Sequence, residues 1–225
     1  MTRTTWRLAS ALAASVAFAV TPATPAAAHG GAADANVTSN YRTSLTDVPQ
    51  IEGLSVDVVD IYGTIELTWT GTGTLIVHGY ENEPYLRFDS SGVYQNQRSP
   101  ATYLNQNRYA NVDPPATADA DATPEWAQLS AARTARWHDH RTHWMSTTPP
   151  AQVRQQPDQR HVIIERWEIP LTIGGQPAVV AGTLTWTPPP SLVPWIAVAA
   201  LIAFVIAGLL WSRWSRVAAA VAASI

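Results

Sequence analysis

The chain has no cysteine and no lysine among its 225 residues. Without cysteine it can form no disulfide, no zinc–thiolate or iron–sulfur cluster and no thiol nucleophile. Without lysine it has no amine for Schiff-base or P-loop chemistry, and every basic residue is an arginine. Any metal site in this protein must therefore use histidine, carboxylate, methionine or main-chain ligands.

Positive charge is also scarce in the central part of the chain. All 17 acidic residues lie between Asp34 and Glu168, and ten arginines between His29 and Pro194 leave that segment with a net charge of −7. Because such a segment repels polyanions, we expect no nucleic-acid partner, and cations are the more natural ligands. The sequence also has no Gly-x-Ser-x-Gly motif, and we expect no enzymatic activity.

Residues 1–28 have the pattern of a secretory signal peptide. Arginines precede an apolar stretch from Leu8 to Val20, and three alanines ending at Ala28 supply the small residues of a cleavage site. Cleavage there would make His29 the first residue of the mature chain. The alternative is a signal anchor that is not cleaved.

The uncharged run 195–211 near the C-terminus is predicted to be a transmembrane helix. Tryptophans flank it, as expected at a membrane–water interface, and Arg213 and Arg216 follow it directly. By the positive-inside rule the tail 212–225 is cytoplasmic, and the prolines within 188–194 predict a stiff stalk. The sequence therefore predicts a single-pass cell-membrane protein that contacts the lipid bilayer through 195–211 and has its N-terminal domain outside the cytoplasm.

The domain from 29 to 187 is predicted to be mainly β, an immunoglobulin-like β-sandwich with a long loop and short-helix insertion over about 95–159. Gly71–Gly73 and Gly174–Gly175 are typical of hairpin turns. The insertion lacks alternating polarity, and we expect one short helix in it from Pro124. Segments rich in β-branched and aromatic residues predict strands over 54–60, 64–70, 74–80, 85–89, 160–169, 170–173 and 178–187.

The stretch from Trp137 to Met145 has the most unusual composition in the chain. It contains three of the six histidines, an aspartate and the only methionine besides Met1. Spacings of two and three residues place pairs of these histidines on one face of a strand or a turn. Imidazole and thioether groups bind late first-row metals, so we predict a site for copper, with zinc as the alternative. The predicted metal residues are His138, His140, His143 and Met145, with Asp139 as a group that orients an imidazole.

Two further interpretations concern the same chemistry. If cleavage follows Ala28, the α-amino group and imidazole of His29 form a bidentate chelate that favours Cu(II), so His29 is a further candidate ligand. The alternative for the cluster itself is a structural one. In that case the histidines bind main-chain groups, Arg141 pairs with a carboxylate, and Trp137 and Trp144 pack against the core.

Three segments, 79–88, 99–105 and 137–145, together with the two termini, resemble a family of uncharacterised actinobacterial membrane-anchored surface proteins. The resemblance implies location and no particular activity. The leader end Ala-Ala-Ala-His is also similar to that of exported copper-handling proteins whose mature chain begins with histidine. We therefore expect a surface protein that binds a transition metal for capture or delivery. The alternative is a non-catalytic module that binds a protein or a component of the cell envelope, with the His/Trp cluster purely structural.

Overall fold

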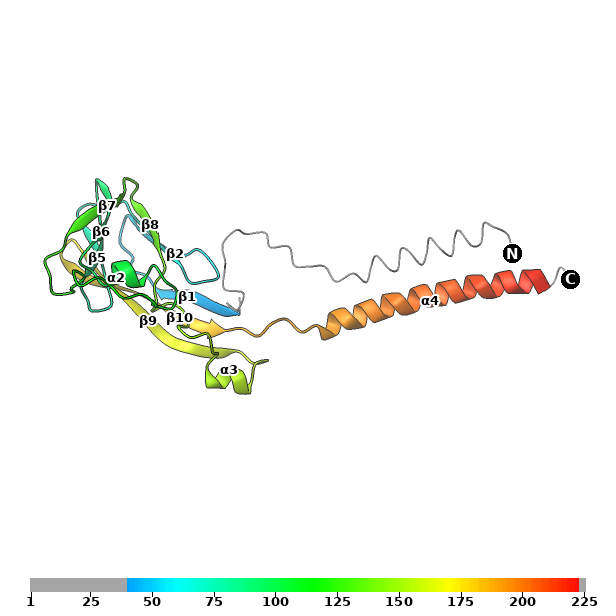
Figure 1. The fold of residues 1–225 in the computed structure, drawn as a ribbon. Helices are drawn as coiled ribbons and strands as arrows, with labels where there is room; N and C mark the ends of the chain where they lie inside the picture. The colour runs from blue at the N-terminus through cyan, green and yellow to red at the C-terminus, as the bar shows by residue number, and fades with distance from the viewer. Residues whose placement is uncertain (1–39, 223–225) are drawn as a thin grey trace. The chain divides into compact units, whose positions relative to one another are not determined.

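The computed structural model describes residues 40–222 (Figure 1). The predicted signal peptide and His29 lie outside the described residues. Within them the chain forms ten strands in two antiparallel sheets, two short helices and one long C-terminal helix. The prediction of a mainly β protein is confirmed.

The larger sheet has seven strands in the order β1-β10-β9-β4-β5-β6-β7. Its longest pair, β9 and β10, is joined by the predicted turn at Gly174–Gly175, where Ile173 pairs with Gln176. Both glycines have positive φ values, of 56° and 82°, which suits a tight hairpin turn. The strands are β1 (Tyr41–Asp47), β4 (Leu75–His78), β5 (Pro84–Asp89), β6 (Gly92–Asn96), β7 (Trp126–Ser130), β9 (His161–Ile173) and β10 (Gln176–Trp186).

The smaller sheet has three strands in the order β2-β3-β8. They are β2 (Leu54–Val58), β3 (Ile65–Trp69) and β8 (Thr134–Trp137). A division into seven and three strands differs from the four and three of a constant-type immunoglobulin domain, so the structure confirms two antiparallel sheets and not the immunoglobulin-like arrangement.

One apolar core is shared by the two sheets. Alternate residues of β3 point inward, and Ile65, Leu67 and Trp69 are buried, as are Leu75 and Phe88 of the larger sheet. This alternation is the period-two pattern of a strand with one face in a core. Each such side chain contributes about 1.5–3 kcal/mol on burial. In a chain without disulfides, this core and the two ladders hold the domain together.

The predicted hairpin at Gly71–Gly73 is wrong. β3 and β4 belong to different sheets, so the chain crosses from the small sheet to the large one at this point. The ring of Trp69 lies against Gly71 and leaves no room for a Cβ there. Its Nε1 donates to the Gly73 carbonyl oxygen at 3.1 Å, and a Cβ on Gly71 would lie 2.2 Å from the indole.

The segment 95–159 is not simply an insertion, because β7 and β8 within it complete the two sheets. The helix expected from Pro124 is wrong: β7 begins two residues later and pairs with β6, with Asn96 opposite Trp126. The Asn96 side-chain oxygen also accepts a hydrogen bond from the Glu125 amide at 2.9 Å. The helices in this segment are α2 (Ala101–Leu104) and α3 (Ala151–Gln155).

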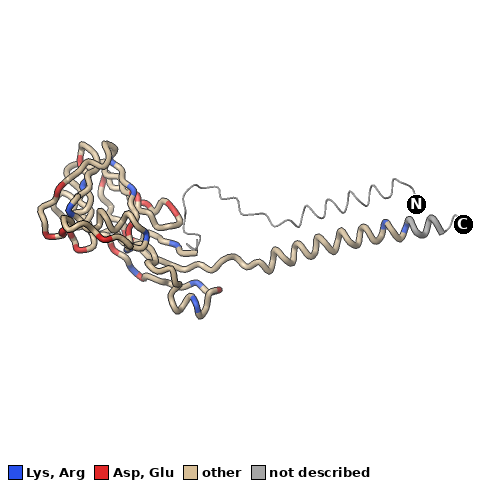
Figure 2. The backbone as a smooth tube through the Cα atoms, viewed as in Figure 1, with Lys and Arg blue, Asp and Glu red and all other residues tan. Residues whose placement is uncertain are grey.

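The C-terminal helix α4 spans Val193–Ala222, and its part Val193–Arg216 is long and apolar enough to cross a membrane. Figure 2 shows that α4 has no charged residue before its C-terminal end, whereas charges are spread over the strand domain. The helix is longer than the predicted 195–211. It includes Pro194 in its first turn, where proline is readily accommodated.

Candidate metal centre

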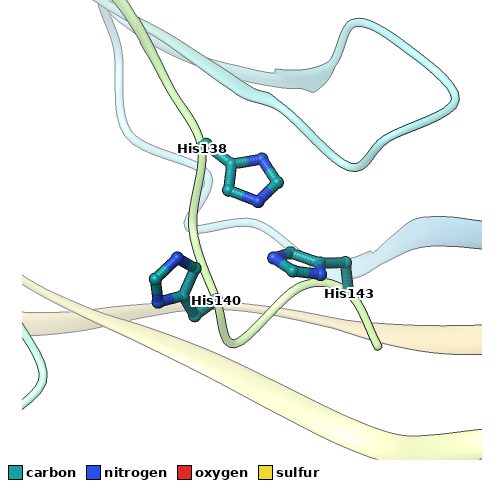
Figure 3. Close-up of side chains that lie close together, drawn as sticks. All are labelled: His138, His140 and His143. Atoms are coloured by element: carbon teal, nitrogen blue, oxygen red, sulfur yellow. The ribbon is translucent and has the colours of Figure 1, made fainter. Parts of the chain in front are cut away.

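The three histidines of the predicted cluster come together in the loop that follows β8. His138, His140 and His143 each offer one ring nitrogen, and these nitrogens lie within 4.8 Å of one another. Figure 3 shows the rings arranged around a common space. Their centroids are 4.2 Å apart for His138 and His143, and 5.7 Å for each pair that includes His140. The loop therefore bends as a three-histidine site requires.

The hydrogen bonds of His140 leave its Nδ1 available. Its Nε2 lies 2.8 Å from the carbonyl oxygen of Asn107, and since a carbonyl can only accept, Nε2 holds the hydrogen. In the neutral ring Nδ1 then has a free lone pair. The ring stacks on Tyr80 with an interplanar angle of 9°, and the His140 amide donates to the Tyr80 hydroxyl at 3.0 Å.

His143 and His138 each present Nε2 to the same space. The His143 Nδ1 donates to the carbonyl oxygen of Trp144 at 3.0 Å, so its Nε2 has the lone pair. Among the described residues, the Nε2 atoms of both His138 and His143 are buried and have no hydrogen-bond partner. A buried ring nitrogen without a partner is unfavourable unless something binds it. A histidine that binds a metal through one ring nitrogen usually donates a hydrogen bond from its other ring nitrogen, often to a main-chain carbonyl.

The spacing of the three nitrogens suits a transition-metal ion after a small closure. An ion at the centre of an equilateral triangle with 4.8 Å sides lies about 2.8 Å from each corner, against a metal–imidazole bond of about 2.0–2.1 Å. Each nitrogen must therefore move by less than about 1 Å, which a ring rotation supplies. Three ligands leave at least one coordination position open.

The electrostatic setting keeps the rings of His138 and His143 neutral. Burial, with the positive charge of Arg108, lowers the pKa of His138 from 6.5 to about 4. Burial, with the neighbouring His138, lowers the pKa of His143 to about 3. At pH 7 these imidazoles are therefore unprotonated, which is the form that binds a metal.

The loop is held in place by the residues between the histidines. Asp139 is fully buried and accepts four hydrogen bonds, one from Trp137 Nε1 at 3.0 Å and three from the amide, Nε and Nη2 of Arg141. Burial alone would raise the pKa of Asp139, but the hydrogen bonds and charge of Arg141 outweigh it and lower the value. Arg141 also donates to the carbonyls of His78 and Gly79, at 3.1 and 3.3 Å.

Thr142 ties the same loop to the strand domain from the other side. Its hydroxyl shares its one hydrogen between the Gly63 and Asp139 carbonyl oxygens, at 2.9 and 2.7 Å, and its own carbonyl accepts from the Thr43 hydroxyl at 2.6 Å. The metal and structural interpretations of this stretch are thus compatible. Asp139, Arg141 and Thr142 fix the loop, while His138 and His143 at its two ends keep ring nitrogens without a partner.

Charged groups of both signs surround the three rings. Arg108 follows Asn107, and its charge acts on His138 and His143. Asp60 interacts with His138 from the loop between β2 and β3; burial raises its pKa, but hydrogen bonds from Thr64 and Tyr62 lower it overall. Asp60 Oδ1 accepts from those two amides, at 3.0 and 2.9 Å.

The predicted site residues therefore separate into groups. The structure brings together His138, His140 and His143, a group that can hold a metal ion. Asp139 orients no imidazole, because its four hydrogen bonds go to Trp137 and Arg141. Met145 has an exposed side chain two residues beyond the last histidine, and its role as a ligand stays a prediction. The predicted ligand His29 lies outside the described residues.

Sequence reasoning did not find the groups that support the rings. Asn107, Tyr80 and Arg108 precede the cluster by 30 to 60 residues, and no spacing rule links a main-chain carbonyl to a distant histidine. The sequence matches no protein-family model and no curated protein, and the fold matches no solved structure. The geometry of the three rings is therefore the observation on which the function rests.

Proposed function

We propose that this protein is a membrane-anchored metal-binding protein whose extracytoplasmic domain holds a divalent transition-metal ion through His138, His140 and His143. One observation carries the proposal: the buried Nε2 atoms of His138 and His143 have no hydrogen-bond partner among the described residues, and one ring nitrogen from each of the three histidines lies within 4.8 Å of the others. Carbonyl groups hold the rings of His140 and His143, and burial keeps His138 and His143 unprotonated at neutral pH, so the three rings form a ligand set. The loop around them is fixed independently, so the rings are positioned before any ion arrives.

Copper is the ion that we propose first. Nitrogen ligands bind Cu(II) more tightly than the other divalent first-row ions, zinc included. The exposed Met145 and an N-terminal His29 would both strengthen the preference for copper. Zinc is the alternative, because three histidines with one open position is also a common zinc arrangement.

The proposed role is capture or delivery and not turnover. The open coordination position lets a donor or acceptor ligand reach the ion, as transfer between proteins requires. The helix α4 supplies the anchor, and Arg213 and Arg216 beyond the apolar stretch favour a cytoplasmic C-terminus. The strand domain then lies outside the cytoplasm, attached to the cell membrane by a single pass.

Metal titration of the full chain in detergent micelles tests the proposal. We expect one Cu(II) or Zn(II) per chain with sub-micromolar affinity, measured by competition with a chelator of known affinity. H143Q and H140Q should each weaken binding at least 100-fold. H161Q is the matched control, because His161 lies on β9 and its Nε2 bonds the Gln156 carbonyl at 2.7 Å.

Two outcomes would count against metal binding. Equal affinity in H143Q and the wild type would move the site elsewhere, and near-UV circular dichroism would show whether the variant is folded. No uptake by the wild type, together with a large loss of thermal stability in H140Q, would favour the alternative of a surface module that binds a protein or envelope partner. In that case the cluster has only a structural role.

A further inference from the structure

The region next to the three rings contains an arginine that the metal ligands do not use. Arg108 directly follows Asn107, the residue whose carbonyl binds His140. Its Nη1 donates to the Tyr62 carbonyl at 3.4 Å, and its guanidinium carbon lies 5.7 Å from the centre of the Tyr62 ring. Its Nε is buried and has no hydrogen-bond partner among the described residues.

The charges around the site are unbalanced once an ion is present. A divalent ion on three neutral imidazoles keeps its full charge of two, and Arg108 adds a third positive charge nearby. Asp139 is already paired with Arg141, and the Asp60 carboxylate, which is bound by two main-chain amides, offsets only one of the three positive charges. A partly buried cluster of positive charge with an open metal position favours an anion as the next ligand.

We infer that the open position of the metal takes a small anion of the carboxylate or bicarbonate type, held between the ion and the guanidinium of Arg108. The inference rests on the proposed function. Guanidinium groups bind such anions through paired N–H donors, and Arg108 has an unused one. A carboxylate of an incoming partner or a free anion has the same chemistry, so this position is where a competing ligand would enter during metal exchange.

Anion titration of the copper-loaded full chain in detergent tests the inference. Azide serves as the probe in buffer free of chloride and carboxylates, because copper-bound azide gives a new absorption band in the near-ultraviolet. We expect a saturable band in the wild type, and acetate should compete with azide for the position. R108Q should keep one copper per chain but weaken azide binding at least tenfold. The azide affinity of R108K should lie between those of R108Q and the wild type. If the chain takes up zinc alone, cobalt(II) replaces copper as the visible reporter.

A second arginine provides the control. R136Q removes an arginine whose side chain is 66% exposed and paired with Glu66, and it should leave azide binding unchanged. Equal azide affinity in R108Q and the wild type would overturn the inference. The inference would also be overturned if the azide band were absent in the wild type and present in D60N. That result would mean that the Asp60 carboxylate itself occupies the open position of the metal. Failure of the wild type to bind any metal is a different result, and it would refute the proposed function.

Discussion

Replacement of Asp139 by asparagine tests whether the histidine loop is held independently of any metal. The carboxylate has no exposed surface, and its four hydrogen bonds come from Trp137 and Arg141. Removal of one partner of a buried ion pair costs about 3–5 kcal/mol. Arg141 keeps its bonds to the His78 and Gly79 carbonyls and is 20% exposed, so we expect the lower end, about 3 kcal/mol.

For a domain of this size that loss corresponds to a fall in the melting temperature of about 6–12 °C. Tryptophan fluorescence of the metal-free full chain in detergent would measure it, because Trp137 donates directly to the altered group. D113N changes an exposed carboxylate in the same way and should shift the melting temperature by less than about 1 °C. A shift below about 2 °C in D139N would show that the Asp139–Arg141 pair does not support the loop.

Acid should destabilise the metal-free domain, because His138 and His143 have pKa values of about 4 and 3 when folded but about 6.5 when unfolded. The unfolded chain therefore binds up to two more protons as pH falls from 6.5 toward 4, and the free energy of unfolding should drop by at most about 2.7 kcal/mol per pH unit. Denaturant unfolding at several pH values checks this, and a flat profile would contradict it. Gly53→Ala should cost more than about 2 kcal/mol, since φ is +87° and the new Cβ would lie 2.2 Å from a main-chain nitrogen. Gly73→Ala, with φ +80° and no atom within 4 Å, should cost only about 1 kcal/mol of strain in the same assay. Phe204→Arg places a charge within α4 at a cost of about 2.5–3.5 kcal/mol, and should reduce the share of the chain in the membrane fraction.

The strands that sequence analysis located are those with strong local patterns. β3 alternates buried and half-buried residues along its whole length, and β9 and β10 are joined by two glycines with positive φ. The strand β7 was missed because only its first and last residues are even half-buried, so it has no apolar alternation to detect. Its pairing with β6 is a long-range contact, which overrides the helix-start signal at Pro124.

The candidate site was also predicted only in part from the sequence. Spacing alone identified the three histidines, because residues so close in sequence can converge with a single bend. The supporting groups depend on the fold, since Tyr80 and Asn107 approach His140 from segments 60 and 33 residues earlier. Asp139 is a different case: its position between histidines suggested an imidazole partner, but its carboxylate binds Trp137 and Arg141, which lie only two residues away on either side.

The short connection between β10 and α4 has a consequence for how such a protein meets its partners. Only residues 187–192 separate the last strand from the helix, and six residues extend to about 20 Å at most. With α4 in the bilayer, the folded domain stays near the lipid surface. If the proposed metal exchange takes place, the exchanging partner must come to the membrane, and a partner that is itself anchored there would meet the domain more often without any added affinity.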